Sequence, residues 1–114
     1  MSDCLFCKIA AGDMQTDIVR EEEDIVAFRD INPQAPTHIL IIPRQHIPRV
    51  ADTDANHQLL LGRLILAANE IAVQEGVAEK GYRLVLNNGD HGGQDVYHIH
   101  LHLLGGRQMS WPPG

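Results

Sequence analysis

The fold is decided by seven residues near the C-terminus, His98-Ile99-His100-Leu101-His102-Leu103-Leu104, in which histidine alternates with apolar side chains. Successive side chains of a β-strand point to opposite faces. The pattern therefore predicts a strand over residues 98–104, with three imidazoles on one face and three apolar side chains on the other. One face would carry chemistry, and the other would pack against the core.

Neighbouring imidazoles on one face of a strand lie roughly 6.5 to 7 Å apart. That spacing allows two rings to touch one small anion, such as a phosphate. A metal site is the alternative, because neutral imidazole is a common ligand and a His-x-His pair can place two rings on one ion. The residues before the strand favour the anion.

Those residues form a polar, glycine-rich loop, Asn87-Asn88-Gly89-Asp90-His91-Gly92-Gly93-Gln94-Asp95. Glycine tolerates positive φ, so neighbouring backbone N–H groups can converge on an oxyanion. The side-chain amides of Asn87 and Gln94 would add neutral donors. By itself the loop is typical of an ordinary hairpin connection. Next to three imidazoles it indicates a phosphate site.

Length and charge narrow the class of protein. A chain of 114 residues with 44% hydrophobic content fits one domain, residues 1–114, with one core. The net charge of −6 disfavours binding to a nucleic-acid polymer, because counterion release needs clustered Lys and Arg. No stretch reaches the ~18 apolar residues of a spanning helix. We therefore expect a cytoplasmic protein that binds no membrane and holds any nucleotide in a local site.

Hydrophobic periodicity predicts two helices and five strands. The helices are expected over 3–11 and, ended by Gly76, over 55–75. The strands are expected over residues 18–22, 25–30, 37–43, 82–88 and 98–104. The most apolar strand, 37–43, should lie at the centre of the sheet. This order predicts an α+β fold, an antiparallel sheet with its helices on one side.

Two cysteines, Cys4 and Cys7, are spaced C-x-x-C. The spacing is compatible with ordinary reduced thiols, with half of a zinc site and with a redox dithiol. A redox dithiol is expected next to a βαβ unit, which this N-terminus lacks. The pair alone leaves these states open.

Three imidazoles beside an anion site suit phosphoryl chemistry. A neutral imidazole is a good nucleophile toward phosphorus, and its ordinary pKa of about 6.5 leaves it mostly neutral near pH 7. Attack would give a phosphohistidine that water later cleaves. A second histidine could protonate the leaving group, and preorganised donors would stabilise the phosphoryl oxygens. This chemistry requires no metal cofactor.

Motifs along nearly the whole chain resemble the histidine triad superfamily, and specifically its nucleotide-binding Hint branch. The matching segments are the histidine strand, Phe28-Arg29-Asp30-Ile31-Asn32-Pro33-Gln34-Ala35-Pro36-Thr37-His38, Gly92-Gly93-Gln94, Tyr97, Gly105-Gly106-Arg107-Gln108-Met109 and Trp111-Pro112-Pro113-Gly114. The resemblance implies a HIT-like fold whose sheet continues across a homodimer. It also implies a purine nucleoside phosphoramidase that hydrolyses P–N bonds of nucleoside 5′-phosphoramidates through a covalent nucleotidyl-histidine and releases AMP or GMP.

The resemblance also implies roles for single residues. His100 corresponds to the nucleophile, and His102 to a phosphate contact that assists proton transfer. His98 and His38 correspond to supporting rings. The remaining nucleotide contacts would be Asp30 at the ribose, Ile31 at the base, and Asn87, Gly93, Gln94 and Asp95 around the phosphate.

Two positions depart from the family pattern. Position 95 carries Asp where animal members have Ser, which puts phosphate affinity in question. Ser110 stands before Trp111 where some relatives have His, in a tail that reaches toward the partner subunit.

Some triad proteins bind zinc through a C-x-x-C pair and two histidines. The matching set here is Cys4, Cys7, His46 and His98, which would be a structural Zn²⁺ site.

Two other functions remain open at this point. A second branch of the superfamily hydrolyses dinucleoside polyphosphates, although the tail motif favours the phosphoramidase. The chain could also be a nucleotide- or metal-binding interaction module without catalysis. The full set of His38, His98, His100 and His102 argues against a module, since a pure binder has no use for a nucleophile.

Overall fold

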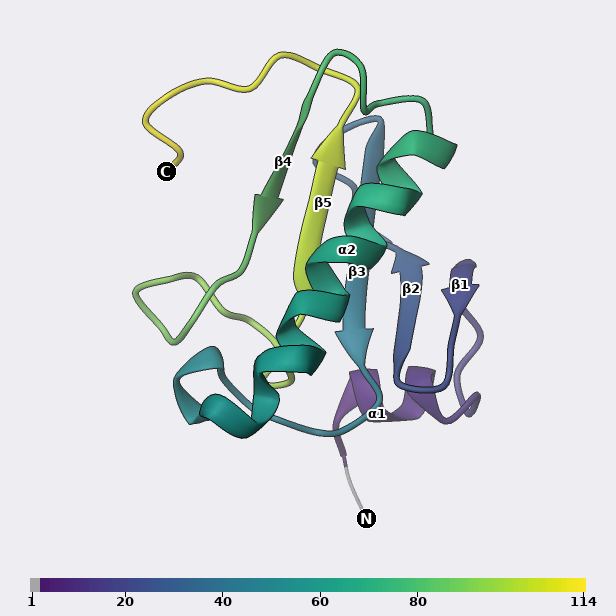
Figure 1. Cartoon of the computed structure of the whole chain (residues 1–114), viewed down its shortest axis with the longest axis vertical. Helices are drawn as coiled ribbons and strands as arrows, with labels where there is room; N and C mark the ends of the chain where they lie inside the picture. Colours follow the sequence, from purple (N-terminus) through teal and green to yellow (C-terminus); the bar gives the residue numbers. More distant parts are fainter. Residues whose placement is uncertain (1–2) are drawn as a thin grey trace.

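The computed structural model describes residues 3–114, which form one five-stranded antiparallel sheet and two α-helices (Figure 1). The strands lie in the order β1-β2-β3-β5-β4. Their bounds are β1 Ile18–Glu21, β2 Ile25–Arg29, β3 Thr37–Pro43, β4 Tyr82–Val85 and β5 Leu101–Gly105. The helices are α1 Leu5–Ala10 and α2 Gln58–Gln74, with 3-10 turns at Val50–Asp52 and Ala55–His57 before α2. The predicted α+β class is confirmed.

Strand β3 is the centre of the sheet, as expected, and all seven of its residues are buried. Ile39 and Ile41 point into a core under α2, where Leu64 and Ile71 of the helix cover them. The alternate side chains belong to a second core on the opposite face. Because both faces are covered, this strand consists of consecutive apolar residues instead of an alternating pattern.

The second core corrects one expectation, that both helices lie on one side of the sheet. Phe6 and Ile9 of α1 pack against Val26, Phe28 and Leu40 on the face away from α2. The apolar side chains of β2 and β3 point to both faces, and one helix can cover only one of them. Helix α1 and helix α2 therefore enclose the sheet from opposite sides.

Strand β5 begins three residues later than predicted. Residues before Leu101 continue the alternation, with Ile99 in the α2 core, but they do not pair with β3. The neighbouring strand ends at Pro43, which has no N–H to continue a ladder. Ile99 instead donates its N–H to the carbonyl of Ile47 at 2.8 Å. This leaves the first two histidines on an irregular segment outside the ladder.

The ends of α2 and β4 also differ from the prediction. The turn at Ala55–His57 is 3-10, because Asp54 accepts a hydrogen bond from the Asn56 N–H at its start, so the α-helix begins at Gln58. Gly76 ends the helix as predicted, at a φ of 76° that favours glycine. Strand β4 stops at Val85, short of the expected residue 88.

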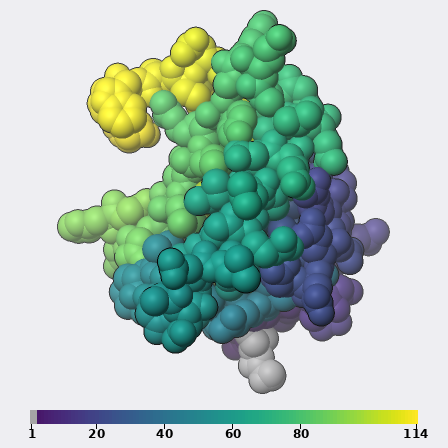
Figure 2. Space-filling view, in the orientation of Figure 1, coloured from purple at the N-terminus to yellow at the C-terminus, as the bar shows by residue number. Residues whose placement is uncertain are grey.

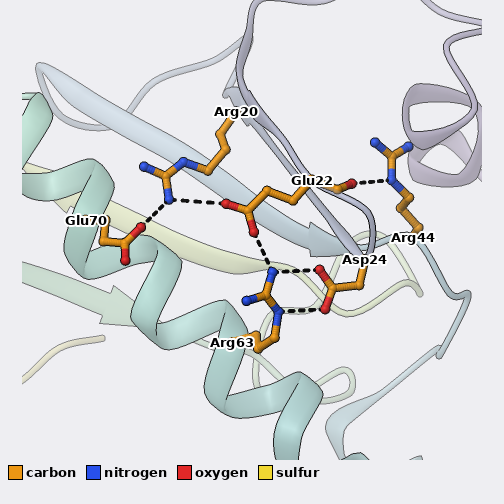
Figure 3. A network of polar contacts seen from close by, with 6 residues as sticks. All are labelled: Arg20, Glu22, Asp24, Arg44, Arg63 and Glu70. Atoms are coloured by element: carbon orange, nitrogen blue, oxygen red, sulfur yellow. Dashed lines mark hydrogen bonds and ion pairs between the residues drawn. The ribbon is translucent and has the colours of Figure 1, made fainter.

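A network of ion pairs joins the β1–β2 hairpin to α2 (Figure 3). Arg63 of α2 donates to both carboxylate oxygens of Asp24, at 2.6 and 2.8 Å, and also contacts Glu22. The hydrogen bond from Arg63 holds the pKa of Asp24 below its ordinary value. Arg20 bridges Glu22 and Glu70 of the helix. The network fixes the hairpin that carries one wall of the cavity described below.

The C-terminal tail and the loop after β4 both project from one side of the molecule, with a hollow between them (Figure 2). The tail is held at its base by two arginines. Arg107 donates to the Gln34 carbonyl at 3.0 Å, and Arg83 donates to the Ser110 carbonyl at 2.9 Å. Between residues 3 and 114 there is no helix with the length and apolar character needed to cross a bilayer.

Candidate active site

The last two histidines of the triad line a cavity of about 260 Å³ on the α1 face of the sheet. Its apolar wall includes Phe6, Ile9, Phe28 and Leu40, and its polar residues include Asp30, Asp95, His100 and His102. Sequence reasoning did not foresee the apolar wall. The helical spacing of Phe6 and Ile9 was visible, but it indicated only core packing.

The position of the proton on His100 follows from its hydrogen bond. Its Nδ1 lies 2.8 Å from the carbonyl oxygen of His98. A carbonyl can only accept, so Nδ1 carries the proton, and in the neutral ring Nε2 holds a lone pair. The ring is buried and stacks edge-on against Phe6 with centroids 5.0 Å apart. The fold thus places at the cavity a histidine with a fixed tautomer, whose Nε2 lone pair is free to react in the neutral ring.

A chain of two hydrogen bonds sets the tautomer of His102. The backbone N–H of Gln34 donates to His38 Nδ1 at 3.0 Å, so His38 carries its proton on Nε2. That nitrogen lies 2.9 Å from His102 Nδ1 and donates to it. The proton of neutral His102 is therefore on Nε2. Within the described residues, this buried Nε2 has no hydrogen-bond partner, which makes it an unused donor on a residue that lines the cavity.

Burial keeps the His38 and His102 rings neutral. Desolvation, together with the nearby His100 and His38 rings, lowers the pKa of His102 to about 4. Desolvation also lowers the pKa of His38, although Asp30, with Oδ2 3.4 Å from His38 Nε2, opposes the shift. The hydrogen bonds from Gln34 to His38 and from His38 to His102 require both rings to be uncharged. His100 and His102, whose centroids are 5.0 Å apart, then present a lone pair and a proton side by side.

Three of the residues expected around a nucleotide stand at the cavity beside these rings. Asp30 lies at the end of β2 and accepts the Asn32 N–H at 2.8 Å. Ile31 is fully exposed and Asp95 is 83% exposed, so both form its open side. One oxygen of Asp95 is 3.6 Å from His100 Nε2.

The loop residues Asn87, Gly93 and Gln94 are not part of the cavity wall. Gln94 is buried, and its amide nitrogen donates to the carbonyls of Pro48 and Val96 at 2.7 and 3.0 Å. Both amide protons are thus used. The expectation that this amide donates to a phosphate is corrected, because Gln94 holds the loop in place. Gly93 has a φ of 82° and donates its N–H to Asp90, and Asn87 is half-buried.

The first histidine of the triad faces a different group of residues. His98 is fully buried, and its Nε2 donates to the Pro43 carbonyl at 2.8 Å, which leaves Nδ1 unprotonated in the neutral ring. That nitrogen lies 3.4 Å from the Cys4 sulfur, 3.6 Å from the Cys7 sulfur and 3.2 Å from His46 Nδ1. As the strand alternation predicted, the three rings share the α1 side of the sheet, where Phe6 lies against both His98 and His100. Of the three, His100 and His102 line the cavity and His98 does not.

Comparison with known proteins places the chain in a family. The family model described as HIT domain matches residues 11–109. The chain is 56% identical over 108 residues to Purine nucleoside phosphoramidase of Escherichia coli, covering 95% of this chain and 91% of that protein. It is 52% identical over 115 residues to the 14 kDa zinc-binding protein of Zea mays, covering 99% of this chain and 89% of that protein.

The chain is also similar in fold and in sequence to the solved structure of a HIT family hydrolase from Legionella pneumophila. It superposes with a TM-score of 0.97 at 56% identity, covering 98% of this chain and all of the other. The chain therefore belongs to the HIT family, which confirms the family and the fold that the histidine motifs predicted.

Proposed function

We propose that this protein is a hydrolase that cleaves the phosphorus–nitrogen bond of purine nucleoside 5′-phosphoramidates. The observation that carries the proposal is the pairing of a lone pair on His100 Nε2 with an unpartnered N–H on His102 Nε2, both at one cavity. A nucleophile beside a hydrogen-bond donor is the arrangement that phosphoryl transfer needs. The name of the E. coli relative agrees with this chemistry.

The reaction takes two steps. First, the Nε2 lone pair of His100 forms a bond to phosphorus while the phosphorus–nitrogen bond breaks, and that electron pair leaves with the amine nitrogen. Second, water attacks phosphorus and the bond to His100 breaks, which returns the electron pair to Nε2. The departing amine takes a proton from solvent in the first step, and the attacking water returns a proton to solvent in the second. The net change therefore consumes one water molecule. The products are an amine and a nucleoside monophosphate.

The surrounding groups stabilise the charges that develop. The His100 ring becomes cationic when it binds phosphorus, and the hydrogen bond from Nδ1 to the His98 carbonyl strengthens. His102 donates its Nε2 proton to a phosphoryl oxygen. With its pKa lowered to about 4, this ring is uncharged near pH 7 and serves as a hydrogen-bond donor. We therefore assign it to charge stabilisation, not to protonation of the leaving group.

The cavity suggests how the nucleotide lies. Asp30 would accept hydrogen bonds from the ribose hydroxyls, as acidic residues do in other nucleotide sites. The apolar wall of Phe28 and Leu40, together with Ile31, would contact the purine ring. The phosphate would then meet His100 and His102 at the polar end.

The test is turnover of adenosine 5′-phosphoramidate by the wild type and two histidine variants. We expect His100→Ala to lose activity by at least about a thousandfold. The matched control is His91→Ala, because His91 is exposed in the loop and lies outside the cavity. Retained activity in His100→Ala, or faster hydrolysis of a diadenosine polyphosphate than of the phosphoramidate by the wild type, would contradict the proposal.

A structural zinc ion fits the cluster of Cys4, Cys7, His46 and His98. Their ligand atoms all lie within 4.8 Å of one another, and the four close contacts between them measure 3.2 to 3.6 Å. A tetrahedral ion with Zn–N near 2.0 Å and Zn–S near 2.3 Å keeps its ligands about 3.3 to 3.8 Å apart. The Nε2–H of His98 is held by the Pro43 carbonyl, the kind of outer contact that orients a ligand histidine.

The zinc would join α1 to the histidine strand and leave catalysis to the other rings. Cobalt substitution tests it, because four ligands of this kind give Co²⁺ a tetrahedral visible spectrum. We expect that spectrum in the wild type and in His91→Ala, and its loss in Cys7→Ser. Equal metal content in the wild type and in Cys7→Ser would contradict the site.

Two uncovered surfaces support a homodimer. Helix α2 exposes Leu59, Leu66 and Val73, spaced seven residues apart and therefore on one side of the helix. Strand β4 is at the edge of the sheet, next to the hollow seen in Figure 2, and the exposed Leu86 follows it. A second copy could pair with this edge and cover the helix. The sheet would then continue from one subunit into the other.

A further inference from the structure

A carboxylate beside the nucleophile is unexpected in a site for an anionic substrate. Asp95 places Oδ1 3.6 Å from His100 Nε2, at the open side of the cavity. Within the described residues, its side chain makes no hydrogen bond. An ionised carboxylate can only accept hydrogen bonds. It therefore cannot bind a phosphoryl oxygen, which also carries negative charge.

No cation of the cavity offsets this carboxylate. The lining holds a second acidic side chain, Asp30, and one guanidinium, Arg29. Arg29 already donates to both oxygens of Glu75, at 2.9 and 2.8 Å, and lies 3.5 Å from Asp17. The pairing with Glu75 raises the pKa of Arg29 above its ordinary value. Within residues 3–114 the lining thus presents more negative than available positive charge before the reaction begins, so it would attract a cation carried by the substrate.

The position of Asp95 shows which part of the substrate could carry that cation. The nucleoside occupies the apolar wall, and phosphorus binds to His100 Nε2. The substrate group left is the amine, which an in-line displacement places on the side of phosphorus opposite Nε2. Asp95 is 83% exposed, so the open side of the cavity has room for a group larger than a phosphate oxygen. A flexible substituent of the amine can fold back toward this carboxylate, which lies beside Nε2.

We propose that Asp95 forms a subsite that selects leaving amines carrying a second, protonated nitrogen a few bonds from the one linked to phosphorus. This inference rests on the proposed phosphoramidase activity and names its preferred leaving group. The substrate class is the adenylylated diamine, or any amine with a similarly placed cation. The carboxylate attracts the distal ammonium before and during cleavage of the phosphorus–nitrogen bond, and it takes no part in the bond changes.

The test compares two adenosine phosphoramidates of matched size, one made from diaminobutane and one from pentylamine. The distal group is an ammonium in the first and a methyl in the second. The measured quantity is the ratio of their kcat/KM values in the wild type, in Asp95→Asn and in Glu23→Gln. Asp95→Asn keeps the shape but removes the charge. Glu23→Gln removes one charge at an exposed residue in the turn between β1 and β2, outside the cavity.

We expect the ratio to be roughly two- to fivefold higher in the wild type than in Asp95→Asn at low salt, which is the range of an exposed ion pair. Any difference in basicity between the two amines cancels in this comparison. The wild-type preference should shrink as salt rises, and Glu23→Gln should match the wild type. Equal ratios in the wild type and Asp95→Asn would overturn the leaving-group subsite alone. Absence of turnover on both compounds by the wild type would instead overturn the phosphoramidase proposal, and the subsite with it.

Discussion

Acid is expected to destabilise this protein in part because it protonates one ring, His102, in the unfolded chain. A comparison of the wild type with the variant His102→Asn at two pH values measures how much free energy of unfolding is lost in this way. The pKa of a histidine is about 6.5 in an unfolded chain, and burial lowers that of His102 to about 4 in the folded chain. Between these values the unfolded chain binds a proton that the folded chain excludes. Stability from this ring is therefore fully present above about pH 6.5 and is lost as the pH falls toward 4.

The size of the effect follows from the same two pKa values. At about pH 7.5 the ring is uncharged in both states, so its titration costs no stability. At about pH 4.5 protonation of this ring in the unfolded chain lowers the free energy of unfolding by about 2.5 kcal/mol. The variant His102→Asn has no titrating group at this position. Its free energy of unfolding should fall by about 2.5 kcal/mol less than that of the wild type between the two pH values.

Urea unfolding followed by circular dichroism, at matched protein concentration, measures both free energies. Circular dichroism is preferred to fluorescence because Trp111 is already exposed in the folded chain. The buried rings His38 and His98 also have lowered pKa values, but they are present in both proteins and cancel. If the wild type and His102→Asn lose the same free energy between the two pH values, the neutral, buried state assigned to His102 is refuted.

Three further predictions concern the core, the subunit interface and the loop. Leu64→Ala should destabilise the chain by about 2 to 5 kcal/mol in urea, because Leu64 is 1% exposed in the core under α2; a loss below about 1 kcal/mol would show that this core is not packed as described. Leu66→Glu should yield monomers in sedimentation equilibrium under conditions where the wild type sediments as a dimer, and an unchanged dimer would exclude the α2 face as the interface. Gly92→Ala should lower stability by about 1 to 3 kcal/mol, because a Cβ there would lie 2.7 Å from the Asn88 carbonyl oxygen; a variant as stable as the wild type would mean that the loop adapts without strain.

Local signals predicted most of the sheet. The bounds of β3 match the expectation at both ends, because an unbroken apolar run ends at Pro43, a residue that also ends the ladder. Gly76 likewise ended α2 where expected. The start of α2 was missed because Asp54 caps a 3-10 turn and not the α-helix. The start of β5 was missed because it depends on the length of the neighbouring strand, which local periodicity does not encode.

The sequence predicted which types of residue form the site, but it did not predict how their side chains are arranged. The alternation correctly placed the apolar partners Ile99, Leu101 and Leu103 in the core under α2. It did not show that His98 turns to the cysteine pair, since that depends on residues far away in sequence. The proton positions on His100 and His102 follow from backbone carbonyls and from His38, and only the folded chain brings these groups together.

The central claim is that a nucleotide passes through the Nε2 atom of His100. Mass spectrometry of the intact protein, acid-quenched or base-quenched within seconds of mixing with adenosine 5′-phosphoramidate, tests it most directly. We predict a mass gain of one adenylyl group, located on the peptide that contains His100, lost in acid, stable in base and absent from His100→Ala. Turnover of the phosphoramidate with no adduct at any quench time, or an adduct that persists in His100→Ala, would contradict the claim.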